Sequence, residues 1–148
     1  MTYALTSFDI EKLPHRKQVL LALTAAKEAL YLVELSHIDQ INNLVSLVEA
    51  YIIGKVDAAK CEHEADLFYR SSVFSTANHD HKNLLSSFIY AALAAEPMNS
   101  PVRVSIACGF ASSSFPSRQE RLAAVARHSN LYDQFLNGDR IFEEVFLK

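Results

Sequence analysis

Residues 15–36 read HRKQVLLALTAAKEALYLVELS, and this stretch decides the fold class. It contains neither Gly nor Pro, the two residues that most strongly disfavour a helix interior. On a helical wheel its apolar residues occupy nearly the whole circumference. The one polar sector that remains is formed by Thr24, Lys27, Glu28 and Glu34. Because a helix that is apolar on nearly all sides belongs in the middle of a bundle, the stretch predicts one long central helix.

The remaining sequence continues in the same helical manner. Its 148 residues include only three Gly and four Pro, well below the average usage of roughly 7% and 5%. Further helices are predicted over residues 6–13, 36–54, 58–77, 81–96, 117–137 and 139–148. Ser100 and Pro101 favour another helix start, but VRVSIA at 102–107 also alternates like a strand, so both forms stay open there.

Start and stop signals mark the ends of several of these helices. Capping side chains are present at Thr6 or Ser7, Ser36 or Asp39, Asp57, Asn78 or Asp80, Ser100, and Ser117, where Glu120 completes a capping box. Gly54 stands where a left-handed cap is expected, and Gly138 follows the helix that ends at Asn137. The sequence SSSFPS at 112–117 predicts a loop.

Together these elements predict an all-α protein. We expect a single domain over residues 1–148, folded as a compact bundle of six to eight helices. An arrangement of stacked, HEAT-like helical hairpins at 15–54 and 57–96, with the C-terminal helices packed back on them, remains open. NLVSLVEAYI (43–52) and NLLSSFIYAA (83–92) share Asn, Leu and Ser at matching positions, a spacing compatible with stacked helical repeats.

Charge and cysteine content limit the function classes. The net charge of −3 gives no basic face for nucleic acid, and residues 61–100 hold five acids against two bases. Cys61 and Cys108 are far apart, which favours a reduced, cytoplasmic protein over a disulfide scaffold. We expect no signal peptide and no membrane association, because the strongest apolar stretch, 84–95, is too short to span a bilayer.

The acidic region contains two stretches rich in functional side chains, CEHEAD from residue 61 and NHDHKN from residue 78. Glu62, Asp66 and Arg70 form a helical stripe at i, i+4 and i+8, in which Asp66 and Arg70 make a favourable surface pair. His63 is three residues from Asp66 and could pair with it. The predicted contact surface for a protein partner comprises Glu62, His63, Asp66, Arg70, Asp80 and His81.

A different interpretation of these stretches is a metal-dependent enzyme that uses His63, Glu64, His79 and His81. Glu64 falls on the apolar side of its helix, where burial would raise its pKa. His79 and His81, however, are about 200° apart on a helix, so they cannot meet one ion there. They could share a metal only in an extended or turn conformation.

Other catalytic and cofactor motifs are missing from the sequence. A di-iron bundle centre needs two Glu-x-x-His motifs, and only Glu34 and His37 have that spacing. No Gly-x-Ser-x-Gly elbow occurs, and Gly54, Gly109 and Gly138 lie too far apart for a phosphate-binding loop. We therefore expect no cofactor, no metal and no catalytic residue.

Residues 15–97 resemble a known family. HRKQVLLALTAAKEAL is followed by a helix ending in VEAYIIGK, by a helix bearing Cys, His and acids, and by NHDHKNLLSSFIYAALAAEP. In this order they resemble the small all-helical immunity proteins that accompany bacterial toxins in polymorphic-toxin systems. The positions that match the family's pattern are Arg16, Gly54, His63 and His81. The resemblance covers about half of the chain.

The resemblance implies a non-enzymatic bacterial protein that neutralises a cognate toxin by stoichiometric binding. Such a protein needs a rigid surface whose charge complements the toxin, and the acidic region 61–100 would suit a basic nuclease toxin. Two alternatives remain: the metal-dependent enzyme, and a helical scaffold or homo-oligomerising module. An exposed apolar face on the helix over 84–96 would favour the scaffold.

Overall fold

The computed structural model describes residues 4–32 and 38–138, apart from the side chains of Ile38 and Asp80. Within these ranges the chain forms eight α-helices, one 3₁₀ helix and no strand, which confirms the all-α prediction. In chain order the elements are α1 (Ser7–Ile10), α2 (His15–Glu28), η1 (Leu30–Leu32), α3 (Ile38–Ile52), α4 (Ala58–Tyr69), α5 (Ser72–Thr76), α6 (His79–Leu93), α7 (Ser100–Ser113) and α8 (Arg118–Asn137).

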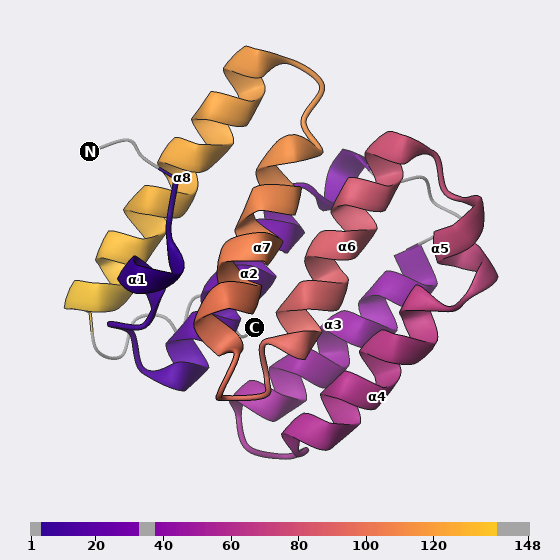
Figure 1. Cartoon of the computed structure of the whole chain (residues 1–148), viewed down its shortest axis with the longest axis horizontal. Coiled ribbons are helices and arrows are strands. Elements are labelled where there is room, and N and C mark those ends of the chain that lie inside the picture. Colours follow the sequence, from indigo (N-terminus) through magenta and orange to yellow (C-terminus); the bar gives the residue numbers. More distant parts are fainter. Residues whose placement is uncertain (1–3, 33–37, 139–148) are drawn as a thin grey trace.

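The helices form two layers (Figure 1). Helices α8, α7, α6 and α4 lie side by side in the front layer, and each contacts its neighbour. Helix α2 passes behind them and packs against α7, α6 and α8, while α3 continues the rear layer behind α6 and α4. The predicted hairpins are thus present as α2–α3 and α4–α6, and the two segments of the 40-residue echo lie in α3 and α6.

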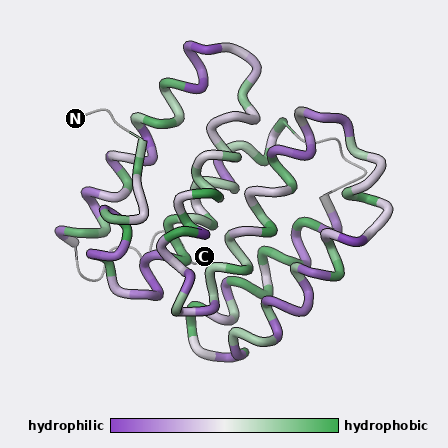
Figure 2. Tube along the Cα trace, viewed as in Figure 1, coloured by the Kyte–Doolittle hydropathy of each residue, from purple (hydrophilic) through white to green (hydrophobic). Residues whose placement is uncertain are grey.

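Helix α2 is the central element that its sequence predicts. Residues 19–23 are at most 1% exposed, and the helix buries residues on several sides. Figure 2 shows hydrophobic residues concentrated where the helices pass through the middle of the bundle. Gln18 is the buried polar side chain of α2, and its amide donates to the Leu13 carbonyl at 2.8 Å.

The prediction of one helix over 15–36 is wrong in length, because α2 ends at Glu28 and a 3₁₀ turn follows. The last turn of α2 is where Glu28 meets α8, through Arg127 at 3.4 Å and His128 at 3.4 Å. Helix propensity is a weak preference that tertiary contacts override. The predicted short turn between this helix and α3 is also wrong, since nine residues separate Glu28 from Ile38.

The predicted helix over 58–77 is divided into α4 and α5. Ser71 divides it, because its hydroxyl donates to the Phe68 carbonyl at 2.6 Å and accepts from the Phe74 amide at 3.4 Å. Ser side chains compete with helical backbone bonds in this way and are favoured at helix starts. The predicted start of the first segment is confirmed, since Asp57 accepts from the Lys60 amide at 2.9 Å.

Most predicted helix starts are confirmed. Thr6, Asn78 and Ser117 are N-caps whose side chains accept the expected backbone amides. Two predicted starts are wrong: Asp39 lies inside the first turn of α3, and Asn99 occupies the position expected for Ser100. Ser36 lies outside the described residues.

The remaining predictions concern the ends of helices and the second half of the chain. Gly54 has φ of +84°, as a left-handed cap requires, and α8 ends at Asn137 as expected. Residues 102–110 are helical as part of α7, which shortens the predicted loop at 112–117, and α1 ends at Ile10 rather than at residue 13. The predicted helix over 139–148 lies outside the described residues.

Candidate functional site

Helix α4 has one buried face and one face open to solvent. Cys61, Ala65 and Phe68 are buried against the core. We call five exposed side chains on its outer face, from His63 onward, the α4 ridge: His63, Asp66, Leu67, Tyr69 and Arg70. This ridge contains three of the predicted contact residues together with two large apolar side chains.

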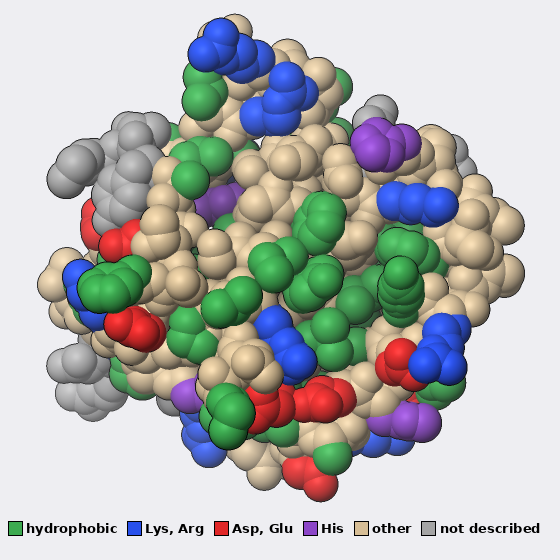
Figure 3. Space-filling view, in the orientation of Figure 1, with side chains coloured by type: hydrophobic (Ala, Val, Ile, Leu, Met, Phe, Trp, Pro, Cys, Tyr) green, Lys and Arg blue, Asp and Glu red, His purple; other side chains and the backbone are tan. Residues whose placement is uncertain are grey.

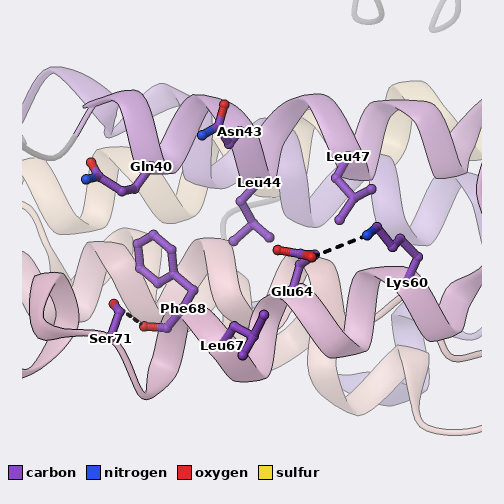
Figure 4. A pocket seen from close by; sticks show the side chains of 9 residues that line it. All are labelled: Gln40, Asn43, Leu44, Leu47, Lys60, Glu64, Leu67, Phe68 and Ser71. Carbon is purple, nitrogen blue, oxygen red and sulfur yellow. Dashed lines mark hydrogen bonds and ion pairs between the residues drawn. The ribbon is translucent and has the colours of Figure 1, made fainter.

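One side of the ridge borders a groove between α3 and α4, which we call the α3–α4 groove (Figure 4). Its volume is about 350 Å³. Leu44, Leu47, Leu67 and Phe68 provide its apolar lining. Gln40, Asn43, Lys60, Glu64 and Ser71 provide its polar lining. Leu67 is 49% exposed, so its apolar surface is available to a partner.

The other side of the ridge borders a second groove, between α4, α5, α6 and α7, also of about 350 Å³. We call it the aromatic groove. Tyr69 stacks on Phe74 with ring centroids 5.0 Å apart, and Tyr90 stacks on Phe110 at 5.8 Å. Its polar lining consists of Asp66 and Ser86. Figure 3 shows hydrophobic side chains gathered over α6 and α7 on this face of the molecule.

The acids of α4 are paired with bases. Glu64 contacts Lys60 at 3.4 Å and Asp66 contacts Arg70 at 3.2 Å, both at i, i+4 spacing on the helix. Glu62 lies 3.9 Å from Arg103 of α7. The expected Asp66–Arg70 pair is therefore confirmed.

These pairs change the interpretation of the acidic region. Lys60 and Arg103 lie just outside residues 61–100, and including them gives five acids against four bases, a formal charge of −1. A charge count over residues 61–100 therefore includes Glu62 and Glu64 but omits the bases with which they pair. Charge alone is thus a weak argument for a basic partner.

The predicted contact residues occupy two places. Glu62, His63, Asp66 and Arg70 lie on α4, whereas Asp80 and His81 lie in the first turn of α6, with α5 between the two helices in the chain. Glu62 is only partly exposed and faces α7 rather than the ridge. Within the described residues, His63 forms no ion pair with Asp66. The Asp66 carboxylate instead binds Arg70.

Glu64 is not buried, as a functional carboxylate with a raised pKa would have to be. Its side chain is 38% exposed and pairs with Lys60, so it is not the buried acid that its place on the wheel indicated. The neighbouring Leu67 is half exposed. The α4 helix therefore has a narrower buried face than its sequence predicts.

The metal-dependent interpretation gains no support from the geometry. His79 and His81 both belong to α6, where helical spacing directs them apart. Over residues 4–32 and 38–138, no group of three or more His, Cys, Asp or Glu side chains could hold a metal ion. The Glu34–His37 motif lies outside the described residues.

Both cysteines are buried thiols. Burial raises the pKa of Cys61 to about 11, and the nearby Asp57 and Glu62 carboxylates act in the same direction. At Cys108 burial, followed by the charge of Glu28, raises the pKa to about 12. Because the thiolate is the reactive form, neither thiol is a competent nucleophile near neutral pH.

The sequence interpretation missed Leu67 and Tyr69 as contact residues and missed both grooves. Leu67 and Tyr69 were missed because apolar side chains in a helix are ordinarily assigned to the core. The aromatic groove was missed because Tyr69 and Phe74 stack only where the helix breaks at Ser71. Two positions of the family resemblance do lie together: Arg16 Nη2 is 3.5 Å from the place that a Cβ on Gly54 would occupy.

In comparisons with known proteins, no family model, no curated protein and no solved structure matches the chain. In the described part of the chain, none of the helices has the length and apolar character needed to cross a bilayer.

Proposed function

We propose that this chain is a non-enzymatic binding protein and that it contacts its protein partner through the α4 ridge. The observation that carries the proposal is the exposure of Leu67 (49%) and Tyr69 (54%), each beside a groove of about 350 Å³. Tyr and Arg are enriched among the residues that dominate binding energy at protein interfaces. Tyr69 and Arg70 stand next to each other on this ridge.

The energetics of this surface favour apolar anchoring. Fully burying a Leu-sized side chain contributes about 1.5–3 kcal/mol, whereas exposed ion pairs such as Asp66–Arg70 contribute about 0–1 kcal/mol. Leu67 and Tyr69 would therefore supply most of the affinity. The paired charges around them would set the orientation and the specificity of the complex.

We further propose that the partner is a bacterial toxin and that the chain is its immunity protein. Support comes from the resemblance over residues 15–97, in which His63 is a matching position and lies on the α4 ridge. Neutralisation by stoichiometric binding needs a rigid surface and no catalytic group. The scaffold alternative has less support, because Leu84, Leu85 and Phe88 of α6 are buried inside the bundle. The apolar side chains that α6 contributes to the aromatic groove, Tyr90 and Leu93, are only partly exposed.

The test is co-expression with the product of a toxin-like gene adjacent to the gene for this chain. We expect a stable complex on size-exclusion chromatography and restored growth of cells that express the toxin. Failure to form a complex, together with failure to protect the cells, would remove the proposal.

A matched pair of variants locates the surface. Leu67→Asp should weaken toxin binding by at least about tenfold, which corresponds to about 1.4 kcal/mol. Leu122→Asp on α8 is the control, because Leu122 is a similarly exposed leucine (54%) on another helix. Equal losses in the two variants, or no loss in Leu67→Asp, would show that the partner binds elsewhere.

A further inference from the structure

The aromatic groove has a chemical character that goes beyond an apolar surface. Its lining contains four aromatic rings in two stacked pairs, and Asp66 is the acidic side chain in that lining. More than half of Tyr69 is exposed, although the ring stacks on Phe74. Aromatic faces carry negative partial charge and attract cations, Arg guanidinium groups in particular. A carboxylate beside such faces adds a second attraction for a cation.

The chain's own bases already occupy the margin of this groove. Lys82 Nζ lies 5.8 Å above the centroid of the Phe74 ring. Arg70 Nε lies 3.2 Å from Asp66 Oδ2, with the Arg70 side chain 76% exposed and Asp66 54% exposed. Two cations therefore sit where the rings and the carboxylate attract them, and one of them is held only by an exposed i, i+4 pair. Such pairs are weak, so another cation can displace Arg70 at little cost.

We infer that the aromatic groove receives a guanidinium or ammonium side chain from the partner, which packs on Tyr69 and replaces Arg70 at Asp66. This inference rests on the proposed function and specifies the chemistry of the partner: a basic side chain on a protruding segment. The chemistry of the lining carries it, because Asp66 is the charged side chain in the groove lining and Lys82 already lies over the Phe74 ring. A cation placed there would meet both a ring face and a carboxylate, whereas Arg70 pairs with the carboxylate alone.

The first experiment uses a probe that is independent of any toxin. N-acetylarginine methylamide and its neutral counterpart N-acetylcitrulline methylamide are titrated separately into the labelled protein, and amide chemical shifts are followed by NMR. We expect shifts at Tyr69, Phe74 and Tyr90, with the citrulline probe binding about 3- to 30-fold more weakly. Equal binding of the two probes, or shifts confined to other helices, would overturn the inference.

Variants separate the contributions of ring and charge. Asp66→Asn and Tyr69→Leu should each reduce arginine-probe binding by about 3- to 10-fold, whereas Tyr69→Phe, which keeps the ring, should not. Glu64→Gln is the matched control, because Glu64 forms the same kind of i, i+4 pair on the same helix but lines the α3–α4 groove. If Glu64→Gln weakens the probe as much as Asp66→Asn does, the site assignment is wrong.

Removing Arg70, which competes with the probe for Asp66, gives a further test. If Asp66 and Arg70 only stabilised the fold, this change would not raise the affinity for the probe. Arg70→Ala should raise the affinity for the arginine probe by about twofold, because Asp66 no longer holds an intramolecular partner. An unchanged or lower affinity would contradict the exchange of cations at Asp66.

The two proposals fail in different ways. If the toxin complex forms and tolerates Asp66→Asn and Tyr69→Leu without loss, the groove inference is wrong and the proposed function stands. If the arginine probe binds as expected but no toxin complex forms, the proposed function is wrong. The groove then binds a basic side chain, but not that of a toxin.

Discussion

Lys17 joins the start of the central helix to the end of the last one. Its ammonium group donates to the carbonyls of Phe135 at 2.8 Å and Gly138 at 2.6 Å, at the C-terminal end of α8. Charge-assisted hydrogen bonds of this kind contribute about 1.5–3 kcal/mol, and a cation also suits the negative end of the helix.

Lys17→Met should therefore lower the free energy of unfolding by about 1.5–3 kcal/mol in urea denaturation. Lys12→Met is the control, because Lys12 is an exposed residue outside the helices, and it should change stability by less than about 0.5 kcal/mol. A Lys17 variant as stable as the control would show that the α8 terminus is satisfied without it.

The two buried thiols predict how the stability of the folded protein falls at alkaline pH. Folding raises the pKa of Cys61 and Cys108 from 9.0 to about 11 and about 12. Between pH 9 and 11 the unfolded chain loses these protons while the folded chain keeps them, so stability falls as pH rises, by at most about 1.4 kcal/mol per pH unit for each thiol. Below pH 9 both states keep the proton and the contribution is fully present.

The measurement is the free energy of unfolding against pH, compared with the same curve for a Cys61→Ala, Cys108→Ala double variant. The variant is expected to be less stable at pH 8, because it loses buried side-chain atoms, but to show a flatter decline above pH 9. Parallel curves would indicate that other groups cause the alkaline loss.

At the scale of helices, replacing two glycines by alanine is expected to change the stability of the protein in opposite directions. Gly54 ends α3 with φ of +84°, a conformation that costs a side-chain-bearing residue about 1–2 kcal/mol. Gly109 lies inside α7, where an added Cβ would meet nothing within 4 Å. A glycine in a helix interior costs about 0.5–1 kcal/mol relative to alanine.

Gly54→Ala should thus destabilise the protein by about 1–2 kcal/mol, and Gly109→Ala should stabilise it by about 0.5–1 kcal/mol. Thermal denaturation of the two variants beside the parent decides both signs. A stabilising Gly54→Ala would mean that the turn after α3 tolerates another backbone path.

Helix boundaries were predicted well where a local signal sets them and poorly where packing does. Asn78 and Ser117 act through hydrogen bonds to residues three positions ahead, so their role is readable from the chain. The end of α2 at Glu28 coincides with a contact to α8 a hundred residues away. No local pattern contains that contact.

At the scale of the whole molecule, the metal-dependent alternative makes a prediction that differs from ours. Because the described residues gather no metal-binding cluster, extensive treatment with a chelator should leave the melting temperature unchanged, within about 1 °C. Elemental analysis of protein purified without added metal should find no stoichiometric ion. A bound ion whose removal lowers the melting temperature would favour the enzyme over the binding protein.

The sequence by itself determined the all-α class, the central place of α2, most helix starts and the outward position of Asp66 and Arg70. These follow from helical periodicity and from capping bonds that span three or four residues. Only the tertiary structure decided that Glu62 meets Arg103 across two helices and that Tyr69, Phe74, Tyr90 and Phe110 line one groove. The reason is physical: helix packing sets these neighbours, and it depends on contacts between residues far apart in the chain.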